Sequence, residues 1–427
     1  MKPRHLQSLL FIVTFVGCSL LLCPGMAQST NKPLKVFILA GQSNMEGHAK
    51  LSSFDHIGMD PKTAPILKEM RDHEGNPTRC EDVWISYLTG PGEGGEGHGK
   101  LTAGYGARTD PQQDGGKIGP EFTFGIYMQK QLNEPILIIK TAWGGKSLHT
   151  DFRSPSAGPY IFSQQQIAQI QKQNKDLTQV QAAKEKATGH YYRLMQQHIK
   201  HVLNDIRRVY PDYQPDQGFE LAGFVWFQGW NDMVDQGTYP NRGEPGGYDA
   251  YSDAMAHFIR DVRRDLSAPN MPFVIGVMGA GGPVEDYDEN RSRYKGIHSG
   301  FRNAMAAPAN LPEFRDNVTA VLTEKYWDPE LDAVSAKVAK VNAKARSLKA
   351  ENQGYPDKQG ALSPQEQKQI VEAYRAELLT DRDLELLKGI TNAEYHYRGS
   401  AKIMAQIGKA FAEALASEES RQGQGQR

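Results

Sequence analysis

A serine at the end of an apolar run is the first group in this chain that could do chemistry. Ser43 belongs to the segment Gly-Gln-Ser-Asn-Met at 41–45, which directly follows the apolar run 36–40. A buried strand that ends in glycine and is followed by a helix would place this hydroxyl at the carboxyl edge of a sheet, among free backbone N–H groups. Serine also caps helices in many loops, so the segment gains meaning from what lies downstream.

Two further polar blocks follow strand-like runs in the order that an acyl-transfer site would need. Trp-Gly-Gly-Lys-Ser at 143–147 follows the run 136–140, and Trp-Phe-Gln-Gly-Trp-Asn-Asp at 226–232 follows the run 221–225. Tyr-His-Tyr at 395–397 then precedes a final amphipathic segment. A Gly-Gly pair or an Asn-Asp pair alone would indicate only a turn or a helix cap. Their joint occurrence after strands favours one shared site.

The four blocks together resemble the SGNH hydrolases, and most closely the sialate O-acetylesterase type, which includes carbohydrate esterases acting on acetylated polysaccharides. The resemblance covers roughly residues 34–415, with insertions, and the block at 41–45 is its most specific part. It implies a three-layer α/β/α sandwich with a mainly parallel, flavodoxin-like central sheet. By analogy with the family, it also implies removal of acetyl groups from an acetylated glycan, the expected partner of this protein.

A serine hydroxyl becomes a nucleophile when a base takes its proton, so Ser43 requires an imidazole within reach. Among the 12 histidines, His396 differs because it precedes Gly399 and a helical pattern over 403–411 that can dock on the sheet. The resemblance places the catalytic base at this position. We therefore predict a pair formed by Ser43 and His396, which transfers an acyl group without any cofactor.

The negative charge that forms on the ester oxygen needs preorganised donors. We expect an oxyanion hole made of the Ser43 backbone N–H, the Gly144 N–H and the Asn231 side-chain amide. Glycine suits the second position because a side chain would obstruct close approach, and Gly145 is an alternative. Asn231 matches the family's Gly-X-Asn pattern at 229–231.

Several side chains that flank these groups are candidates for substrate contact. We expect Gln42, Gln228 and Trp230 to bind the substrate. Trp143, Trp230 and Tyr397 are candidates for a sugar platform, although aromatic rings of this kind equally often pack in a core.

The acid of the triad departs from the family pattern. The family usually places Asp three residues before the histidine, where this chain has Ala393. Glu394, two residues before His396, is the candidate that we assign to orient the imidazole; Asn392 stands four residues before. Asp232, or a backbone carbonyl in a Ser-His dyad, remains an alternative.

The N-terminal segment, the net charge and the spacing of His and Cys residues indicate where the protein is located and which partners it has. Residues 1–27 have a positive start, an apolar stretch and small residues before a cut, as in a secretory signal peptide. The apolar stretch is short for a membrane span of about 20 residues, so we expect export without a membrane span after cleavage. A formal net charge of −1 argues against a nucleic-acid partner. We expect no metal, because no His/Cys cluster has zinc-ligand spacing.

The apolar runs and helical patterns between them predict one α/β hydrolase domain over 34–417, followed by a polar tail at 418–427. Residues 89–119 are rich in glycine and are expected to form a lid or rim loop. Residues 163–188 are expected to be a solvated helix or partly disordered. Residues 328–390 predict a helical hairpin insertion, which we expect to pack against the sheet. The expected strands are 35–40, 83–88, 136–140, 221–227, 272–277 and 318–322.

Two other functions remain open at this point. A GDSL-type lipase or general esterase would need a wide apolar channel for the acyl chain. A glycan-binding protein that has kept the fold and lost turnover is the second alternative, which the missing Asp keeps open.

Overall fold

A seven-stranded sheet organises the computed structural model, which describes residues 32–89, 95–107, 116–353 and 361–425. Six strands are parallel, and β4 runs antiparallel to β3 at one edge. The spatial order is β4-β3-β6-β1-β7-β8-β9. These strands are β1 (Leu34–Gly41), β3 (Val83–Leu88), β4 (Glu96–Lys100), β6 (Ile136–Ala142), β7 (Phe219–Phe227), β8 (Phe273–Val277) and β9 (Val318–Leu322).

All six strands expected from the sequence are present in this sheet, and β4 is the strand of the sheet that was missed. It lies inside the glycine-rich segment 89–119, of which residues 90–94 and 108–115 are outside the described residues. Its sequence, Glu-Gly-His-Gly-Lys, carries no apolar alternation, so no pattern could indicate a strand. The expectation of a plain loop is therefore wrong at β4. A separate two-stranded sheet pairs β2 (Ala49–Lys50) with β5 (Lys117–Ile118), and β5 lies within the same glycine-rich segment.

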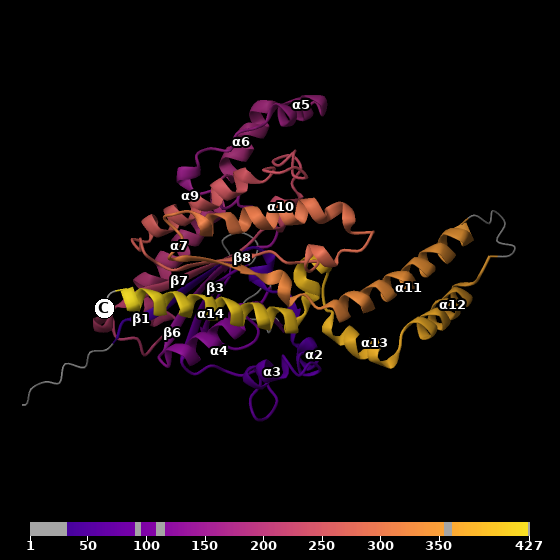
Figure 1. Ribbon diagram of the computed structural model, residues 1–427, viewed down its shortest axis with the longest axis horizontal. Helices are drawn as coiled ribbons and strands as arrows, with labels where there is room; N and C mark the ends of the chain where they lie inside the picture. The colour runs from indigo at the N-terminus through magenta and orange to yellow at the C-terminus, as the bar shows by residue number, and fades with distance from the viewer. Residues whose placement is uncertain (1–31, 90–94, 108–115, 354–360, 426–427) are drawn as a thin grey trace, which may run out of the picture. The chain divides into compact units, whose positions relative to one another are not determined.

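Helices cover both faces of the sheet, as expected for a three-layer α/β/α sandwich (Figure 1). On β1, Val36 and Ile38 point into one core, while Phe37 and Leu39 point into the other. Burying each such side chain contributes roughly 1.5–3 kcal/mol. The first core is covered by α7 (His190–Asn204), α9 (Asp249–Asp265) and α10 (Lys295–Ala306), and the second by α2 (Phe54–Gly58), α3 (Ala64–Met70), α4 (Glu121–Leu132) and α14 (Ala401–Gly425).

The predicted insertion is a helical hairpin followed by a short helix. It consists of α11 (Pro329–Gln353), α12 (Pro364–Leu378) and α13 (Asp381–Leu386), and α11 and α12 pack against each other (Figure 1). Contrary to our expectation, the insertion does not share the cores of the sheet. It has its own small cluster, which is built on Leu331, Val334, Leu379 and Leu386. The apolar positions of α11 therefore face its neighbouring helices.

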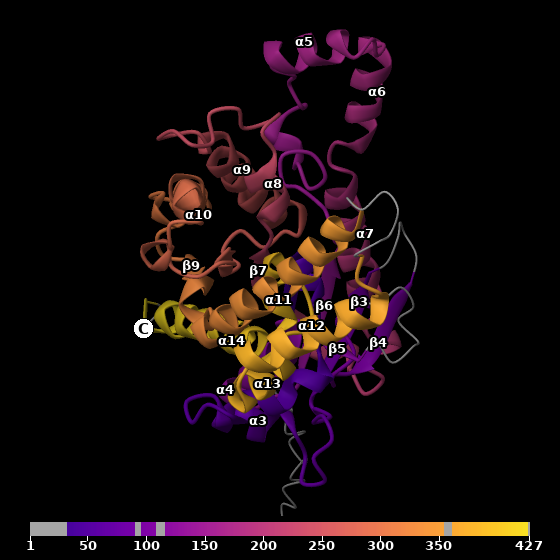
Figure 2. The ribbon, with the colours of Figure 1, turned by 90° about the vertical axis from the view of Figure 1, so that its right-hand side faces the viewer.

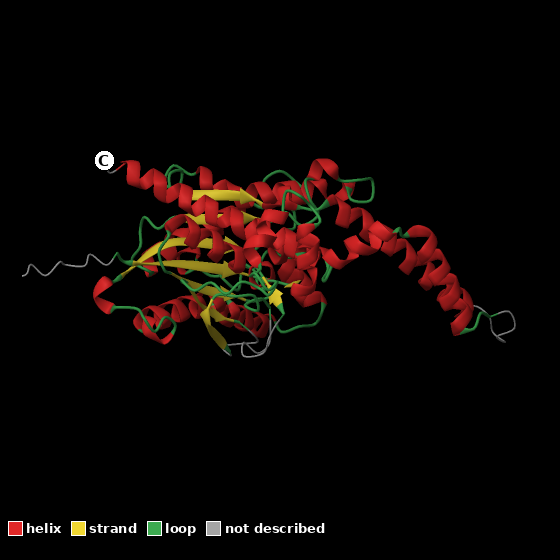
Figure 3. Cartoon of the chain, turned by 90° about the horizontal axis from the view of Figure 1, so that it is seen from below, coloured by secondary structure: helices red, strands yellow, loops and turns green. Residues whose placement is uncertain are grey.

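The segment 163–188 forms two exposed helices, α5 (Gln164–Lys172) and α6 (Leu177–Ala187), neither of which has a buried residue (Figure 2). The last helix continues to Gly425, so the expected polar tail is helical for most of its length. Figure 3 shows how the helices enclose the strands. Residues 1–27, the expected signal peptide, lie outside the described residues, and within the described ones no helix is long and apolar enough to cross a membrane.

Candidate active site

Three of the four blocks follow three neighbouring strands. The sheet places β1 between β6 and β7, and Gly41 at the end of β1 is in register with Ala142 and with Phe227. The carboxyl ends of these strands therefore meet at one edge, which is where open α/β sheets bind ligands. The expected convergence of these blocks is thus a consequence of strand order.

The short helix α1 (Ser43–Glu46) presents Ser43 directly above this edge. A Cβ on Gly41 would lie 2.1 Å from the Phe227 carbonyl oxygen, so only glycine allows β1 and β7 to approach here. At the other end of α1, the buried Lys140 ammonium donates to the Glu46 carbonyl oxygen over 3.0 Å. Lys140 also forms a fully buried ion pair with Glu121 at 2.7 Å, so the ammonium that contacts this end of α1 is itself fixed.

Gly144, which follows β6, lies beside both the serine and the Glu46 carboxylate. A Cβ on Gly144 would lie 3.7 Å from the Ser43 Cβ and 3.1 Å from Glu46 Oε2. Burial raises the pKa of the Glu46 carboxyl group. Gly145, the alternative donor, has φ +73° and open space around it. Sequence reasoning missed Glu46, although its place three residues after Ser43 on one helix was a usable signal.

Gln42 organises the remaining donors. Its Oε1 accepts from Gln228 Nε2 and from the Gly229 N–H, each at 3.1 Å. Its Nε2 donates to Asn231 Oδ1 at 3.1 Å and lies 3.4 Å from Ser43 Oγ. Because Asn231 Oδ1 is engaged, the Asn231 Nδ2 group is the one that can donate to a ligand. Gln42 and Gln228 are each 2% exposed, so the structure places them in the framework of the site, where we had expected contact with substrate.

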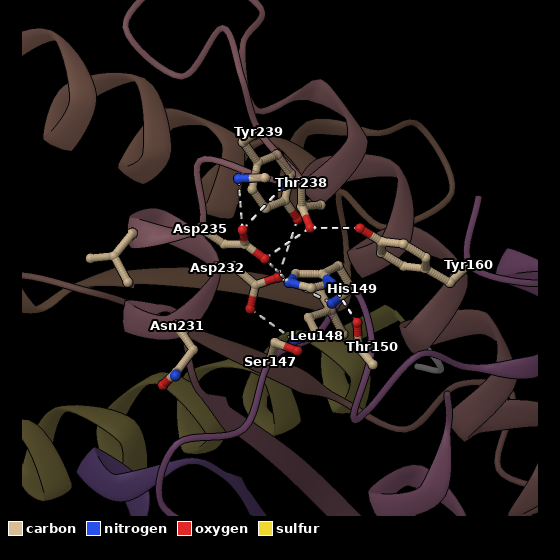
Figure 4. Close-up of polar contacts among 12 residues, drawn as sticks. Ser147, Leu148, His149, Thr150, Tyr160, Asn231, Asp232, Asp235, Thr238 and Tyr239 are labelled. Atoms are coloured by element: carbon tan, nitrogen blue, oxygen red, sulfur yellow. Dashed lines mark hydrogen bonds and ion pairs between the residues drawn. The ribbon is translucent and has the colours of Figure 1, made fainter. Parts of the chain in front are cut away.

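The helix α8 (Trp230–Val234) carries Asn231 and Asp232 in different directions (Figure 4). The fully buried Asp232 carboxylate accepts from the Leu148 N–H at 2.8 Å, the His149 N–H at 3.1 Å and the Tyr239 hydroxyl at 3.1 Å. It therefore holds the loop after Gly-Gly-Lys-Ser against α8. Asn231 lies apart from this cluster in Figure 4. Asp232, one of the alternatives for the triad acid, is thus committed to positioning the loop.

The side-chain amide of Asn392 is the hydrogen-bond partner of His396 Nδ1. Asn392 Oδ1 lies 3.0 Å from His396 Nδ1 and accepts from the Ala393 N–H at 2.7 Å. The second bond identifies the oxygen of the Asn392 amide, because a backbone N–H can only donate. His396 Nδ1 must then carry the proton, which leaves Nε2 unprotonated and able to act as a base.

The carboxylate that we assigned to orient His396 has other partners. Glu394 Oε1 lies 3.3 Å from Arg291 Nη2, and Glu394 Oε2 lies 3.7 Å from Arg398 Nη2. The acceptor facing the imidazole is Asn392, the residue four positions before it. Asn392 orients the imidazole of His396, but it lacks the negative charge that an Asp would have at this position.

A second imidazole lies flat against the first. The rings of His48 and His396 are stacked, with centroids 4.0 Å apart and planes 5° apart. Burial, with a smaller effect of the Lys117 charge, lowers the pKa of His396 to about 4. Burial and then the neighbouring His396 lower the pKa of His48 to about 3. Both rings are therefore neutral at pH 7, the state that a base requires.

The loop carrying His396 has an unusual backbone that is held from two sides. Tyr397, Arg398 and Gly399 have φ values of 50°, 58° and 58°, and the two non-glycine residues each cost about 1–3 kcal/mol in this region. The buried Tyr397 hydroxyl accepts from the Gly279 N–H at 2.7 Å. Arg398 Nη1 donates to Ser335 Oγ on α11 at 2.8 Å. The insertion therefore contributes to fixing the loop of the proposed base.

Ser43 and His396 are brought together by their neighbours. The Asn44 side chain donates from Nδ2 to the Tyr395 carbonyl oxygen at 3.1 Å. This bond joins the residue after Ser43 to the residue before His396, although 351 positions separate its two partners. The four blocks of the sequence thus meet at one edge of the sheet.

Of the three aromatic residues that we considered for stacking on a sugar, only Trp230 lines a cavity that a ligand could enter. Trp143 is 2% exposed and Tyr397 is fully buried, so both belong to the core. Trp230 packs on Tyr395, with ring centroids 5.5 Å apart, and lines a cavity of about 530 Å³. In the described part of the chain, no three His, Cys, Asp or Glu side chains come close enough to hold a metal ion.

The match to a protein family decides the identification. A family model described as carbohydrate esterase, sialic acid-specific acetylesterase, matches residues 105–318, half of the chain. The chain belongs to this family of carboxylic ester hydrolases. The matched segment contains Gly144 and Asn231 and stops short of Ser43 and His396 on either side.

Two solved structures are similar at low identity, and no match to a curated protein is found. One is a carbohydrate acetylesterase from Xanthomonas citri, with 14% identity and a TM-score of 0.34, covering 67% of this chain and 49% of the other. The other is an Arabidopsis thaliana protein, with 17% identity and a TM-score of 0.37, covering 81% of this chain and all of the other. The chain thus spans about half the length of the Xanthomonas citri protein.

Proposed function

We propose that this protein removes acetyl groups from an acetylated carbohydrate by a Ser-His acyl-enzyme mechanism. The observation that carries the proposal is the hydrogen bond from Asn44 Nδ2 to the Tyr395 carbonyl oxygen, which brings the loop of His396 to the helix of Ser43. The membership in a carbohydrate esterase family supports the substrate class. The experiment below compares two acetylated sugars as substrates.

In the first step, His396 Nε2 takes the Ser43 proton as Ser43 Oγ attacks the acetyl carbonyl carbon. The bond to the sugar oxygen then breaks, and His396 returns the proton to that oxygen, leaving acetyl-Ser43 and the free sugar hydroxyl. Water attacks acetyl-Ser43 in the second step with His396 again as base. Acetate leaves, and Ser43 recovers its proton.

The negative charge that forms in both steps is stabilised by the Ser43 N–H and by Asn231 Nδ2. The first N–H groups of a helix have no acceptor within the helix, which suits the Ser43 N–H to this role. Gln42 orients the Asn231 amide from behind. The Gly144 N–H is the third donor of the proposed oxyanion hole, because Gly144 lies beside Ser43.

An acetate-release assay on acetylated xylo-oligosaccharides and on O-acetylated sialic acid tests this proposal. We expect wild-type protein to release acetate from at least one of them. Ser43→Ala and His396→Ala should each lower the rate by 10³-fold or more. Ser417→Ala, on the exposed end of α14, is the matched control and should behave as wild type. Equal acetate release by wild type and Ser43→Ala would overturn the mechanism.

We further propose that the protein is exported and that residues 1–27 are removed in the process. The expected product begins at Gln28. Intact mass measurement of protein secreted or released from a bacterial envelope would show this start. Recovery of full-length chain in the cytoplasm alone would contradict export.

A further inference from the structure

The cavity next to the proposed active site has the features of a binding site. It has a volume of about 530 Å³, within the range of roughly 300–1,000 Å³ typical of ligand pockets. The described residues expose seven large hydrophobic side chains, and three of these line this one cavity: Val234, Tyr294 and Tyr395, at 44%, 37% and 43%. Exposed apolar groups that gather in a hollow indicate a ligand surface.

Aromatic rings line the cavity from two parts of the chain. Trp230 and Tyr395 pack with centroids 5.5 Å apart, and Tyr294 and His298 stack with centroids 5.8 Å apart. The first pair adjoins the proposed catalytic groups directly, because Trp230 precedes Asn231 and Tyr395 precedes His396 in the chain. A flat ligand with apolar faces and a polar rim, such as a pyranose ring, fits these surfaces.

One guanidinium in the cavity is held by backbone carbonyls. Arg242 Nη1 donates to the Met233 carbonyl at 3.2 Å and to the Val234 carbonyl at 3.1 Å, both at the end of α8. Among the described residues, no carboxylate lies within ion-pair distance of Arg242. A guanidinium fixed in this way loses little freedom when it pairs with a ligand carboxylate through two parallel hydrogen bonds.

The other charges of the cavity are already balanced within the protein. Arg291 pairs with Asp332 at 2.8 Å and with Glu394 at 3.3 Å. His298 has its pKa lowered to about 4 by burial and by nearby arginines, including Arg242, so it is neutral at pH 7. The positive charge of Arg242 is therefore the one that is available to a ligand.

We propose that this cavity binds a carboxylate-bearing sugar unit that neighbours the acetylated sugar of the glycan. Arg242 holds the carboxylate, and the ring of the sugar lies against Trp230 and Tyr395. This inference rests on the proposed function for its choice of a sugar. It adds that the preferred substrate is an acidic glycan, and it names the residue that selects it.

Calorimetric binding to Ser43→Ala, which does not turn over, tests the proposal. The probes are a glucuronic acid-substituted xylo-oligosaccharide and the same oligosaccharide with its carboxyl group reduced to an alcohol. We expect the acidic probe to bind about 10- to 100-fold more tightly, the value of one charged hydrogen-bonded pair, and to lose this advantage as salt rises. Adding Arg242→Gln should abolish the difference, and Arg242→Lys should retain part of it. Arg346→Gln, on the exposed surface of α11, is the control of equal charge and should retain all of it.

Equal affinity for the two probes in the Ser43→Ala protein, or no binding of either, would overturn the proposal. If Arg242→Gln and Arg346→Gln reduced the affinity advantage of the acidic probe equally, the proposal would also be overturned. Cinnamate, an aromatic acid, is a third probe, and tighter binding of cinnamate than of the acidic oligosaccharide would also overturn the choice of a sugar. These binding results do not depend on turnover. Acetate release by wild type tests the proposed function separately.

Discussion

Replacing Asn392 with Asp should turn the amide partner of His396 into a charged one without changing its shape. Asn392 Oδ1 lies 3.0 Å from His396 Nδ1, so the new carboxylate would contact the ring directly. An opposite charge at this distance typically shifts a pKa by about 1–3 units. The pKa of His396, which burial lowers to about 4, should therefore rise to about 5–7.

The sign of the effect on activity follows from the role of a base. As the proposed base, His396 acts in its neutral form, so activity should fall as the pH drops through its pKa. In Asn392→Asp this fall should begin about 1–3 pH units higher than in wild type. At pH values above the pKa of His396, the stronger base should increase kcat. The increase is about 3- to 30-fold if half of the pKa change is expressed in the transition state.

The assay is the pH dependence of kcat and of kcat/KM for acetate release between pH 3 and pH 9. Asn392→Ala should lower kcat by about tenfold, because the imidazole loses its acceptor. Glu394→Gln is the matched control, since its carboxylate faces Arg291 and Arg398. An unchanged profile in Asn392→Asp together with a shifted one in Glu394→Gln would refute our assignment of Asn392.

Three further variants test the surroundings of the site. In His48→Ala, His396 loses a stacked ring that buries it, so the acid limb of kcat/KM should move to higher pH; an unchanged limb would contradict the role of burial. Tyr397→Phe should lower the free energy of unfolding by about 1–3 kcal/mol in urea titration, because the Gly279 N–H loses its acceptor, whereas no change would contradict it. Lys140→Met should cost about 3–5 kcal/mol in the same measurement, since it leaves the buried Glu121 carboxylate unpaired, and a cost below about 1 kcal/mol would argue against that pair.

The sequence predicted the sheet well because its parallel strands are buried on both faces. Strands such as β1 and β6 are continuous apolar runs bounded by polar blocks, and this pattern is readable without any knowledge of the fold. The edge strand β4 is made of glycine and polar residues. Its pairing with β3 is a tertiary contact that no local pattern could indicate.

The sequence was enough to predict at which edge of the sheet the candidate site lies, but it was not enough to predict which side chains are hydrogen-bonded there. Strand order brings the blocks together, whereas side-chain partners depend on distances that the sequence does not contain. Asn392 was visible four residues before His396, but a search for a carboxylate favoured Glu394. The closeness of Gly144 to the Glu46 carboxylate is also a tertiary contact, so it could be found only in the structure.

The central claim is that His396 activates the hydroxyl of Ser43. The most direct measurement is the rate at which a p-nitrophenyl phosphonate modifies the protein, with the modified residue identified by peptide mass spectrometry. We predict one adduct, on Ser43, which forms at least 100-fold more slowly in His396→Ala. Modification of a different residue, or an equal rate in His396→Ala, would contradict the claim.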